Sequence, residues 1–310
     1  DILATTGGSE ALQMAMSCIL DEGDEILIPE PFYTNYNTFV HVAGGSIRPV
    51  PSSPEEGYRY AERSRIEPLI TERTRAILVT NPGNPTGTVL TPEEMQLIAD
   101  IAREHGLFLV ADEVYREFVY GGEPLSTFLT IPGIEENLIV VDSVSKRFSA
   151  CGARVGALIS RNPEFIAQAM KLCQGRLCSA TLDQLGASAL YSVDPDYFNA
   201  TRDEYRRRRN ACVEGLHKIP GVVCGEPKGA FYLMAKLPVD DADRFQTWLL
   251  EEFEDQGETL MFAPGEGFYG TPGKGKDEIR IAYVLNEADI RRSMELLGIA
   301  IDRYRKEKMA

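Results

Sequence analysis

Short apolar runs rich in β-branched residues alternate with longer amphipathic stretches in the first half of the chain. The apolar runs, which predict strands, occupy residues 25–29, 46–50, 76–80, 107–111, 138–141 and 155–160. Helical spacing of apolar residues occurs between them, at 9–20, 34–43, 92–105 and 163–173. Such alternation is typical of βαβ units. It therefore predicts an α/β fold with a mostly parallel central sheet flanked by helices.

The pattern changes after about residue 194. A long helical stretch at 195–217 leads into predicted strands at 229–237, 259–263 and 278–284 and predicted helices at 241–254 and 287–306. Residues 265–276 are dense in Gly and Pro and predict a loop. We therefore expect a large domain over 1–194, an interdomain helix over 195–217 and a smaller α+β domain over 218–310.

Two helices and the start of the chain carry clear local signals. Thr91 precedes Pro92 and two glutamates, a helix start in which Thr91 is the N-cap. Trp248 shares a helical pattern with apolar neighbours and is expected in the core. Residues 1–6 predict a strand that opens without an initiator Met, so we expect a further segment to precede it.

Composition excludes several classes of protein. The formal net charge is −15, which argues against a nucleic-acid partner, and the basic run 206–209 is expected on a solvated or interdomain helix face. Six cysteines without a C-x-x-C pair and three scattered histidines indicate a reduced, cytoplasmic protein without a metal site. No leader and no apolar run of about 18 residues is present, so neither export nor a membrane partner is expected.

Polar residues that carry chemistry follow the predicted strands. The turn Thr6-Gly7-Gly8-Ser9 leads into a helix N-terminus, where backbone amides and the Ser9 hydroxyl could hold a phosphate, although strand-to-helix turns also need glycine for structural reasons. The segment 81–87, Asn-Pro-Gly-Asn-Pro-Thr-Gly, is a rigid loop that presents an asparagine amide at the carboxyl end of a sheet, unless it is simply an Asn-Pro turn.

The next two strands end in charged residues. Asp112, with Tyr115 three residues later, could pair with a positively charged ring nitrogen or could serve as a helix cap. Lys146 follows another strand and is flanked by Ser143 and Ser145, a setting poorly explained by a solvated charge. Arg154 lies just downstream and offers a guanidinium fork for a phosphate.

The order of these motifs resembles the class I and II aminotransferases, the aspartate aminotransferase-like members of the fold type I pyridoxal phosphate enzymes. The motifs are G-x-S-E-A, P-x-Y, N-P-x-N-P-T-G, D-E-x-Y, S-x-S-K and G-x-R-x-G, and the resemblance covers essentially the whole chain. The resemblance implies the fold type I architecture. It also implies that the expected segment before residue 1 is the N-terminal part of that architecture.

The resemblance also implies a role for each matching residue toward pyridoxal 5'-phosphate. Gly8, Ser9, Ser143 and Arg154 would bind the phosphate. Tyr33 would stack on the ring, Asn84 and Tyr115 would donate to its phenolic oxygen, and Asp112 would keep its nitrogen protonated. Lys146 would hold the cofactor as a Schiff base and, once displaced by substrate, would transfer the α-proton.

The implied substrates are small molecules, an L-amino acid and a 2-oxo acid that exchange an amino group by ping-pong kinetics. Asn84 and Arg280 would bind the substrate carboxylate, although an arginine on a strand is often a structural ion pair. The resemblance further implies a homodimer. Cys151, near Lys146, could line the pocket, but we expect it to be a buried packing residue.

Two alternatives keep the same fold. A pyridoxal phosphate-dependent C–S lyase, or another fold type I reaction, would use the same lysine and would release ammonia and pyruvate without amino transfer. A non-catalytic aminotransferase-like sensor would need a DNA-binding segment, which this acidic chain lacks. The donor side chain, whether aspartate, aromatic, alanine or branched-chain, stays open.

Overall fold

The computed structural model describes residues 1–121 and 126–309. Its larger sheet has seven strands in the order β1-β7-β6-β5-β4-β2-β3. Six strands run in the same direction, and β7 is antiparallel to both of its neighbours. The strands are β1 Ile2–Thr5, β2 Glu25–Pro29, β3 Ser46–Val50, β4 Thr74–Thr80, β5 Phe108–Asp112, β6 Leu138–Ser143 and β7 Gly156–Ser160. The mostly parallel sheet predicted from the sequence is therefore present.

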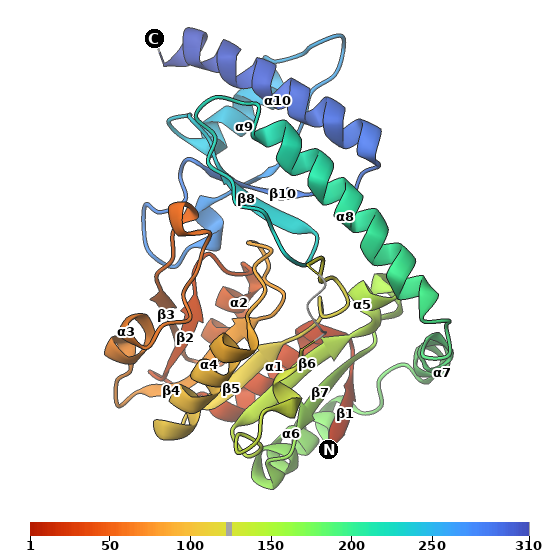
Figure 1. Ribbon diagram of the computed structural model, residues 1–310. Helices are drawn as coiled ribbons and strands as arrows, with labels where there is room; N and C mark the ends of the chain where they lie inside the picture. The colour runs from red at the N-terminus through yellow and green to blue at the C-terminus, as the bar shows by residue number, and fades with distance from the viewer. Residues whose placement is uncertain (122–125, 310) are drawn as a thin grey trace.

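Helices cover both faces of this sheet (Figure 1). The helices of this part are α1 Gly8–Ile19, α2 Asn35–Val42, α3 Arg63–Ile66, α4 Pro92–Glu104, α5 Val144–Arg147, α6 Pro163–Arg176 and α7 Thr181–Leu190. Alternate side chains of one strand enter opposite cores. On β2, Ile26 and Ile28 pack with α1, α2 and α6, whereas Leu27 packs with α4. Because both faces of the sheet are covered there, the middle residues of β2, β4, β5 and β6 are apolar, whereas the edge strands β1 and β3 keep exposed or polar positions.

The C-terminal part forms a second, antiparallel sheet in the order β8-β10-β9. Its elements, with the long helix that leads to it, are α8 Asp196–Leu216, β8 Tyr232–Lys236, α9 Ala242–Glu251, β9 Ala263–Pro264, β10 Glu278–Ala282 and α10 Glu287–Lys308. Figure 1 shows α8 running beside both sheets, with α10 packed against its C-terminal half. We propose that α8 divides the chain at the boundaries expected above. Trp248 is buried in this core, as predicted.

Most predicted bounds agree with the structure to within three residues, but one predicted strand is mostly absent and one longer helix was not predicted. No strand forms over residues 259–262, because the backbone amide of Phe262 donates to the Gln246 side chain instead of to a strand partner. Helix α7 was not predicted, and its apolar residues Leu182 and Leu185 are exposed in the structure. The Gly-rich loop contains one short 3-10 helix, Glu266–Phe268.

The basic run on α8 has two environments. Arg206 and Arg207 pair with acids one turn away on the exposed surface. Arg209 is buried and donates to the Pro227 carbonyl oxygen at 2.8 Å, so it ties α8 to the segment before β8. Among the described helices, none has the length and apolarity needed to cross a membrane. The described residues also contain no cluster of three or more potential metal ligands.

Replacing Thr91 by alanine is expected to lower the free energy of unfolding by about 1 kcal/mol. The Thr91 hydroxyl accepts from the Glu94 amide, and the Glu94 carboxylate accepts from the Thr91 amide, which completes a capping box at the start of α4. Thr34 precedes α2 without any side-chain cap and provides the matched control, Thr34→Ala. Equal losses in urea denaturation of the two variants would contradict the assignment.

Candidate active site

A cavity of about 290 Å³ lies at the carboxyl edge of the large sheet, where side chains of the small sheet close it. Strands β4, β5 and β6 end side by side, with Thr80 paired to Asp112 in the β-ladder. The residues after these strand ends therefore meet at one place. All ten residues singled out from the sequence line this cavity: Gly8, Ser9, Tyr33, Asn84, Asp112, Tyr115, Ser143, Lys146, Arg154 and Arg280.

One end of the cavity is built to attract an anion. Helix α1 begins after Gly7 without a side-chain cap, so the first-turn amides, including those of Gly8 and Ser9, keep no intrahelical partner. The Arg154 guanidinium lies directly beside this turn and donates to the Thr6 carbonyl oxygen at 3.3 Å. A Cβ at Gly7 would come within 2.4 Å of the Arg154 Nη2 atom, and φ of Gly7 is +82°, so glycine is required there.

Hydroxyl groups continue this anion-attracting end. Ser143 caps α5, accepting from the Ser145 amide at 3.1 Å, while its own hydroxyl lies 2.8 Å from the Ser145 hydroxyl. The Ser143 hydroxyl also reaches the Val155 carbonyl oxygen at 3.1 Å. The two serines therefore act together, because Ser143 is engaged in the turn and Ser145 presents a second hydroxyl to the cavity.

Lys146 and Arg147 are adjacent but lie in opposite environments. The Arg147 guanidinium is buried and pairs with Asp142 at 2.6 Å and with Glu117 at 3.4 Å. The Lys146 amine points instead into the cavity, 5.8 Å from the ring centre of Tyr115 and 5.7 Å from that of Phe231. Within the described part of the chain, no carboxylate pairs with it. Its amine is thus available to a ligand.

Asp112 is the single carboxylate in the described lining of the cavity. It accepts from the Tyr36 hydroxyl at 2.7 Å and from the Val114 amide at 3.3 Å. Tyr36 itself lies 2.6 Å from the Thr80 hydroxyl, which positions it. Burial is the largest cause that raises the pKa of Asp112 from 3.8 to about 6, and the Tyr36 hydrogen bond opposes that shift. A positive charge placed beside Asp112 would remove this penalty.

Arg280 enters the cavity from β10 between two aromatic rings. Its guanidinium carbon lies 4.5 Å from the centre of the Tyr232 ring and 4.9 Å from that of Phe268. It donates to the Asn84 side-chain oxygen at 3.2 Å, while its Nε atom is buried without a partner among the described residues. Because Arg280 forms no ion pair with any described carboxylate, the structural alternative considered above finds no support.

Tyrosines form the walls between these polar ends. The Tyr115 hydroxyl lies 3.3 Å from that of Tyr232, and burial raises the pKa of Tyr115 well above its usual range. Tyr33 packs edge-on against Tyr36, with ring centres 5.5 Å apart, and its hydroxyl accepts from the Asn35 side chain at 2.8 Å. Burial of Tyr115 and partial burial of Tyr33 raise the pKa of both hydroxyls, so both stay protonated donors at neutral pH.

Several lining residues were missed in the sequence or misjudged. Those missed are Leu12, Tyr36, Thr80, Val114, Ser145 and Tyr232. Ser145 is the second serine of the S-x-S-K motif and was named only as a neighbour of Lys146, so motif reasoning could have found it, whereas Tyr36 and Tyr232 resemble core residues in the sequence. The expectation for Cys151 was wrong. Its side chain is exposed and lines the cavity, because residues 151–153 form a surface 3-10 turn.

The charge of the lining contrasts with that of the whole chain. Three cationic side chains, Lys146, Arg154 and Arg280, face one carboxylate, Asp112, in a protein with a formal charge of −15. Such a local excess concentrates anions in the cavity. It suits a ligand that carries a phosphate at one end and a carboxylate at the other.

Comparison with known proteins agrees with this geometry. The chain matches the family described as aminotransferase class I and II over residues 1–296. An aspartate aminotransferase of Streptomyces avermitilis is 33% identical over 304 residues, 93% of this chain and 71% of that protein. Aromatic-amino-acid aminotransferase 2 of Thermococcus litoralis is 31% identical over 98% of this chain and 75% of that protein.

Solved structures show the same architecture. The aromatic aminotransferase of Pyrococcus horikoshii superimposes with a TM-score of 0.88 at 28% identity, covering 100% of this chain and 80% of that one. Thermus thermophilus aspartate aminotransferase with maleate gives 0.85 at 30% identity, covering 96% and 75%. These relatives favour neither the C–S lyase nor the sensor alternative. The chain belongs to the aminotransferase class I and II family and has its fold type I architecture.

Proposed function

We propose that this transaminase uses pyridoxal 5'-phosphate to move the amino group of an L-amino acid to a 2-oxo acid in two half-reactions. The observation that carries the proposal is the Lys146 amine, which faces a cavity between an anion-attracting end and a buried carboxylate. An amine without a carboxylate partner is the group needed to bind an aldehyde covalently. The three parts of the cavity match the three parts of the cofactor.

The phosphate fits the end built by α1. In the proposed arrangement, Gly8 and Ser9 donate backbone amides, while the Ser9 and Ser143 hydroxyls and the Arg154 guanidinium complete the set. The close approach that glycine allows between Gly7 and Arg154 supports this assignment, since a Cβ would fill that space. The backbone amides at the uncapped start of α1, which have no intrahelical partner, also favour an anion at this place.

The cofactor ring would lie next to this phosphate site, between the side walls of the cavity. Asp112 would hold the ring nitrogen in its protonated form, because a positive partner relieves the cost of burying the carboxylate. When bound, pyridoxal phosphate supplies a conjugated ring that accepts electrons from the substrate carbon. Tyr33 would pack on the ring face, and Asn84 and Tyr115 would donate to its phenolic oxygen.

Lys146 and Arg280 would act on the substrate. Arg280 binds the substrate carboxylate with its paired nitrogens, aided by Asn84, which already contacts it. Only the Nη1 atom of Arg280 donates to Asn84, and the Nε atom has no partner among the described residues, so donors of the guanidinium are left for that carboxylate. Lys146, once released from the aldehyde, carries the proton from the substrate α-carbon.

An absorbance experiment tests the proposal. Purified protein mixed with pyridoxal phosphate should develop a visible band of lysine-bound cofactor, which should change on addition of particular amino acids. Aspartate and aromatic amino acids should be tried first, because relatives with these names align over nearly the whole chain. No band, or ammonia and pyruvate without amino transfer, would contradict the proposal.

Replacing Arg280 by lysine is expected to lower kcat/KM for amino acids by about 10- to 100-fold, because one charged hydrogen bond contributes about 1.5–3 kcal/mol. The loss should vanish for an amine of the same side chain that lacks the carboxylate. Arg291→Lys, at an exposed ion pair on α10, is the matched control. A similar loss with both substrates would show that Arg280 does not bind the carboxylate.

We also propose a homodimer in the cytoplasm. Apolar side chains stand exposed on and near α7, with Leu177 75%, Leu182 83%, Leu185 64% and Tyr191 63% accessible. Such a patch supports contact with a second copy of the chain. The six cysteines are all free, which supports a reducing compartment. Sedimentation of the purified protein tests the dimer.

A further inference from the structure

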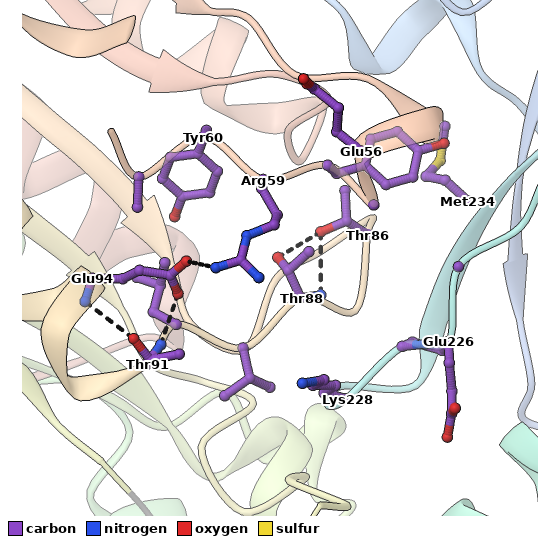
Figure 2. A pocket seen from close by; sticks show the side chains of 17 residues that line it. Glu56, Arg59, Tyr60, Thr86, Thr88, Thr91, Glu94, Glu226, Lys228 and Met234 are labelled. Carbon is purple, nitrogen blue, oxygen red and sulfur yellow. Dashed lines mark hydrogen bonds and ion pairs between the residues drawn. The ribbon is translucent and has the colours of Figure 1, made fainter. Parts of the chain in front are cut away.

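A second cavity, of about 280 Å³, adjoins the loop that carries Asn84. Asn84 lines the candidate active site, whereas Thr86 and Thr88, two and four residues later, line the second cavity. The opposite walls come from residues 56–61 and 225–228 and from Met234 on β8 (Figure 2). The second cavity thus lies between the large sheet region and the C-terminal part, beside the active site.

The floor of the second cavity is apolar. Tyr58, Tyr60, Leu90 and Met234 are each buried, and their side chains line it. The Tyr58 hydroxyl is already used, because it donates to the buried Glu278 carboxylate at 2.8 Å. This surface can therefore receive an apolar group of about the size of an aromatic ring.

The carboxylates around the second cavity already have partners. Glu94 accepts from Arg59 at 2.7 Å and from the Thr91 amide, so both its oxygens are engaged. Both oxygens of Glu56 accept from Arg65, at 2.8 and 2.9 Å. Glu226 pairs with the buried Arg209 at 2.8 Å. These acids are consequently poor candidates for binding a cation.

The groups that remain unused are hydrogen-bond donors. Within residues 1–121 and 126–309, the Lys228 ammonium and the Tyr60 hydroxyl have no side-chain or backbone partner, and Arg59 uses one nitrogen only. Burial and the nearby Glu94 carboxylate raise the pKa of Tyr60, which keeps it protonated. Figure 2 shows the Arg59 guanidinium turned toward Glu94 and the Thr88 hydroxyl toward Thr86, whereas no interaction is drawn to the Lys228 amine.

We propose that the second cavity binds a small organic carboxylate with an apolar, aromatic-sized body. The carboxylate would accept hydrogen bonds from Lys228, Arg59 and Tyr60, because the polar groups of the lining that still lack a partner are hydrogen-bond donors. The body would lie on the apolar floor. A compact inorganic anion would leave that floor in contact with water, and a cation would find its acids already paired.

The second cavity and the active site share the loop at 81–88. The amides of Lys228 and Gly229 both donate to the Gly87 carbonyl oxygen, at 2.8 and 2.9 Å. A Cβ at Gly87 would come within 2.3 Å of Pro227 and 2.6 Å of the Tyr232 carbonyl oxygen, so loop and segment are in direct contact. A ligand held by Lys228 would therefore lie against the loop that positions Asn84 beside Arg280.

Calorimetric titration of the holoenzyme with 3-phenylpropionate tests the second cavity. This acid has neither an amine nor a carbonyl group, so it cannot react. Two molecules are expected to bind per chain, one at Arg280 and one at Lys228. Lys228→Met should lower the affinity of one binding event by about tenfold, since one charged hydrogen bond is lost, and should leave the affinity of the other unchanged. Tyr60→Phe should weaken the same event less.

Two variants make the titration decisive. Lys306→Met, at an exposed lysine on α10, removes the same charge far from the cavity and should change neither event. Arg280→Met should remove the event that Lys228→Met spares. A single event per chain, or two events that both survive Lys228→Met, would overturn the proposal. The cofactor band is recorded separately, so failure here leaves the proposed transaminase function intact.

Discussion

Replacing Lys146 by alanine is expected to lower kcat by about 10⁴-fold, at the upper end of what a positioned acid–base group contributes. The variant loses both the amine that binds the aldehyde and the group that moves the α-proton. Arg147 cannot substitute for it, because its guanidinium is held by Asp142 and Glu117 away from the cavity. Single-turnover kinetics with an amino acid measure the loss.

The cofactor should still associate with the Lys146→Ala protein through its phosphate. Gly8, Ser9 and Arg154 are untouched by the substitution, and they line the far end of the cavity. Borohydride treatment followed by mass spectrometry should therefore add the cofactor mass to the wild-type chain and none to the variant. Lys171→Ala, at an exposed lysine on α6, serves as control. Covalent cofactor on the variant would refute the role of Lys146.

Replacing Asp112 by asparagine is expected to lower kcat by about 10²- to 10³-fold. Removing one partner of a buried charge pair costs about 3–5 kcal/mol, and here the orphaned group would be the protonated ring nitrogen. The neutral amide can still accept from Tyr36, so the surrounding packing should persist. Absorbance of the bound cofactor as a function of pH measures whether the ring nitrogen loses its proton in the variant.

In the protein without cofactor, Asp112→Asn is expected to increase the stability of the fold at neutral and higher pH, although it lowers kcat of the holoenzyme. Because burial raises the pKa of Asp112 to about 6, its contribution to stability is full at low pH and is lost as the pH rises through 6. A shift from 3.8 to about 6 corresponds to about 3 kcal/mol. The variant should therefore melt at a higher temperature than the wild type at pH 8, and the two should converge near pH 4. Equal melting temperatures at pH 8 would contradict the buried charge.

The layered architecture and the ends of its strands could be predicted from local pattern alone. Strand and helix periods are properties of short segments, so β2 and β3 were placed at their observed bounds. Residues at or just beyond the carboxyl ends of strands, such as Asp112 and Lys146, must lie at one edge of a parallel sheet whatever its strand order. Nine of the ten residues named from the sequence lie at strand ends of the large sheet and line one cavity for this reason, whereas Arg280 reaches the same cavity from β10 of the small sheet.

Partners that come from other elements could not be predicted in this way. Tyr36 lies inside α2 and looks like a core residue, but the packing of that helix on the sheet brings its hydroxyl to Asp112. Tyr232 contacts both Tyr115 and Arg280 only because β8 of the small sheet closes the cavity. The second cavity likewise depends on residues 56–61 and 225–228 meeting. Sequence spacing sets what each element presents, whereas long-range packing selects which side chains meet across elements.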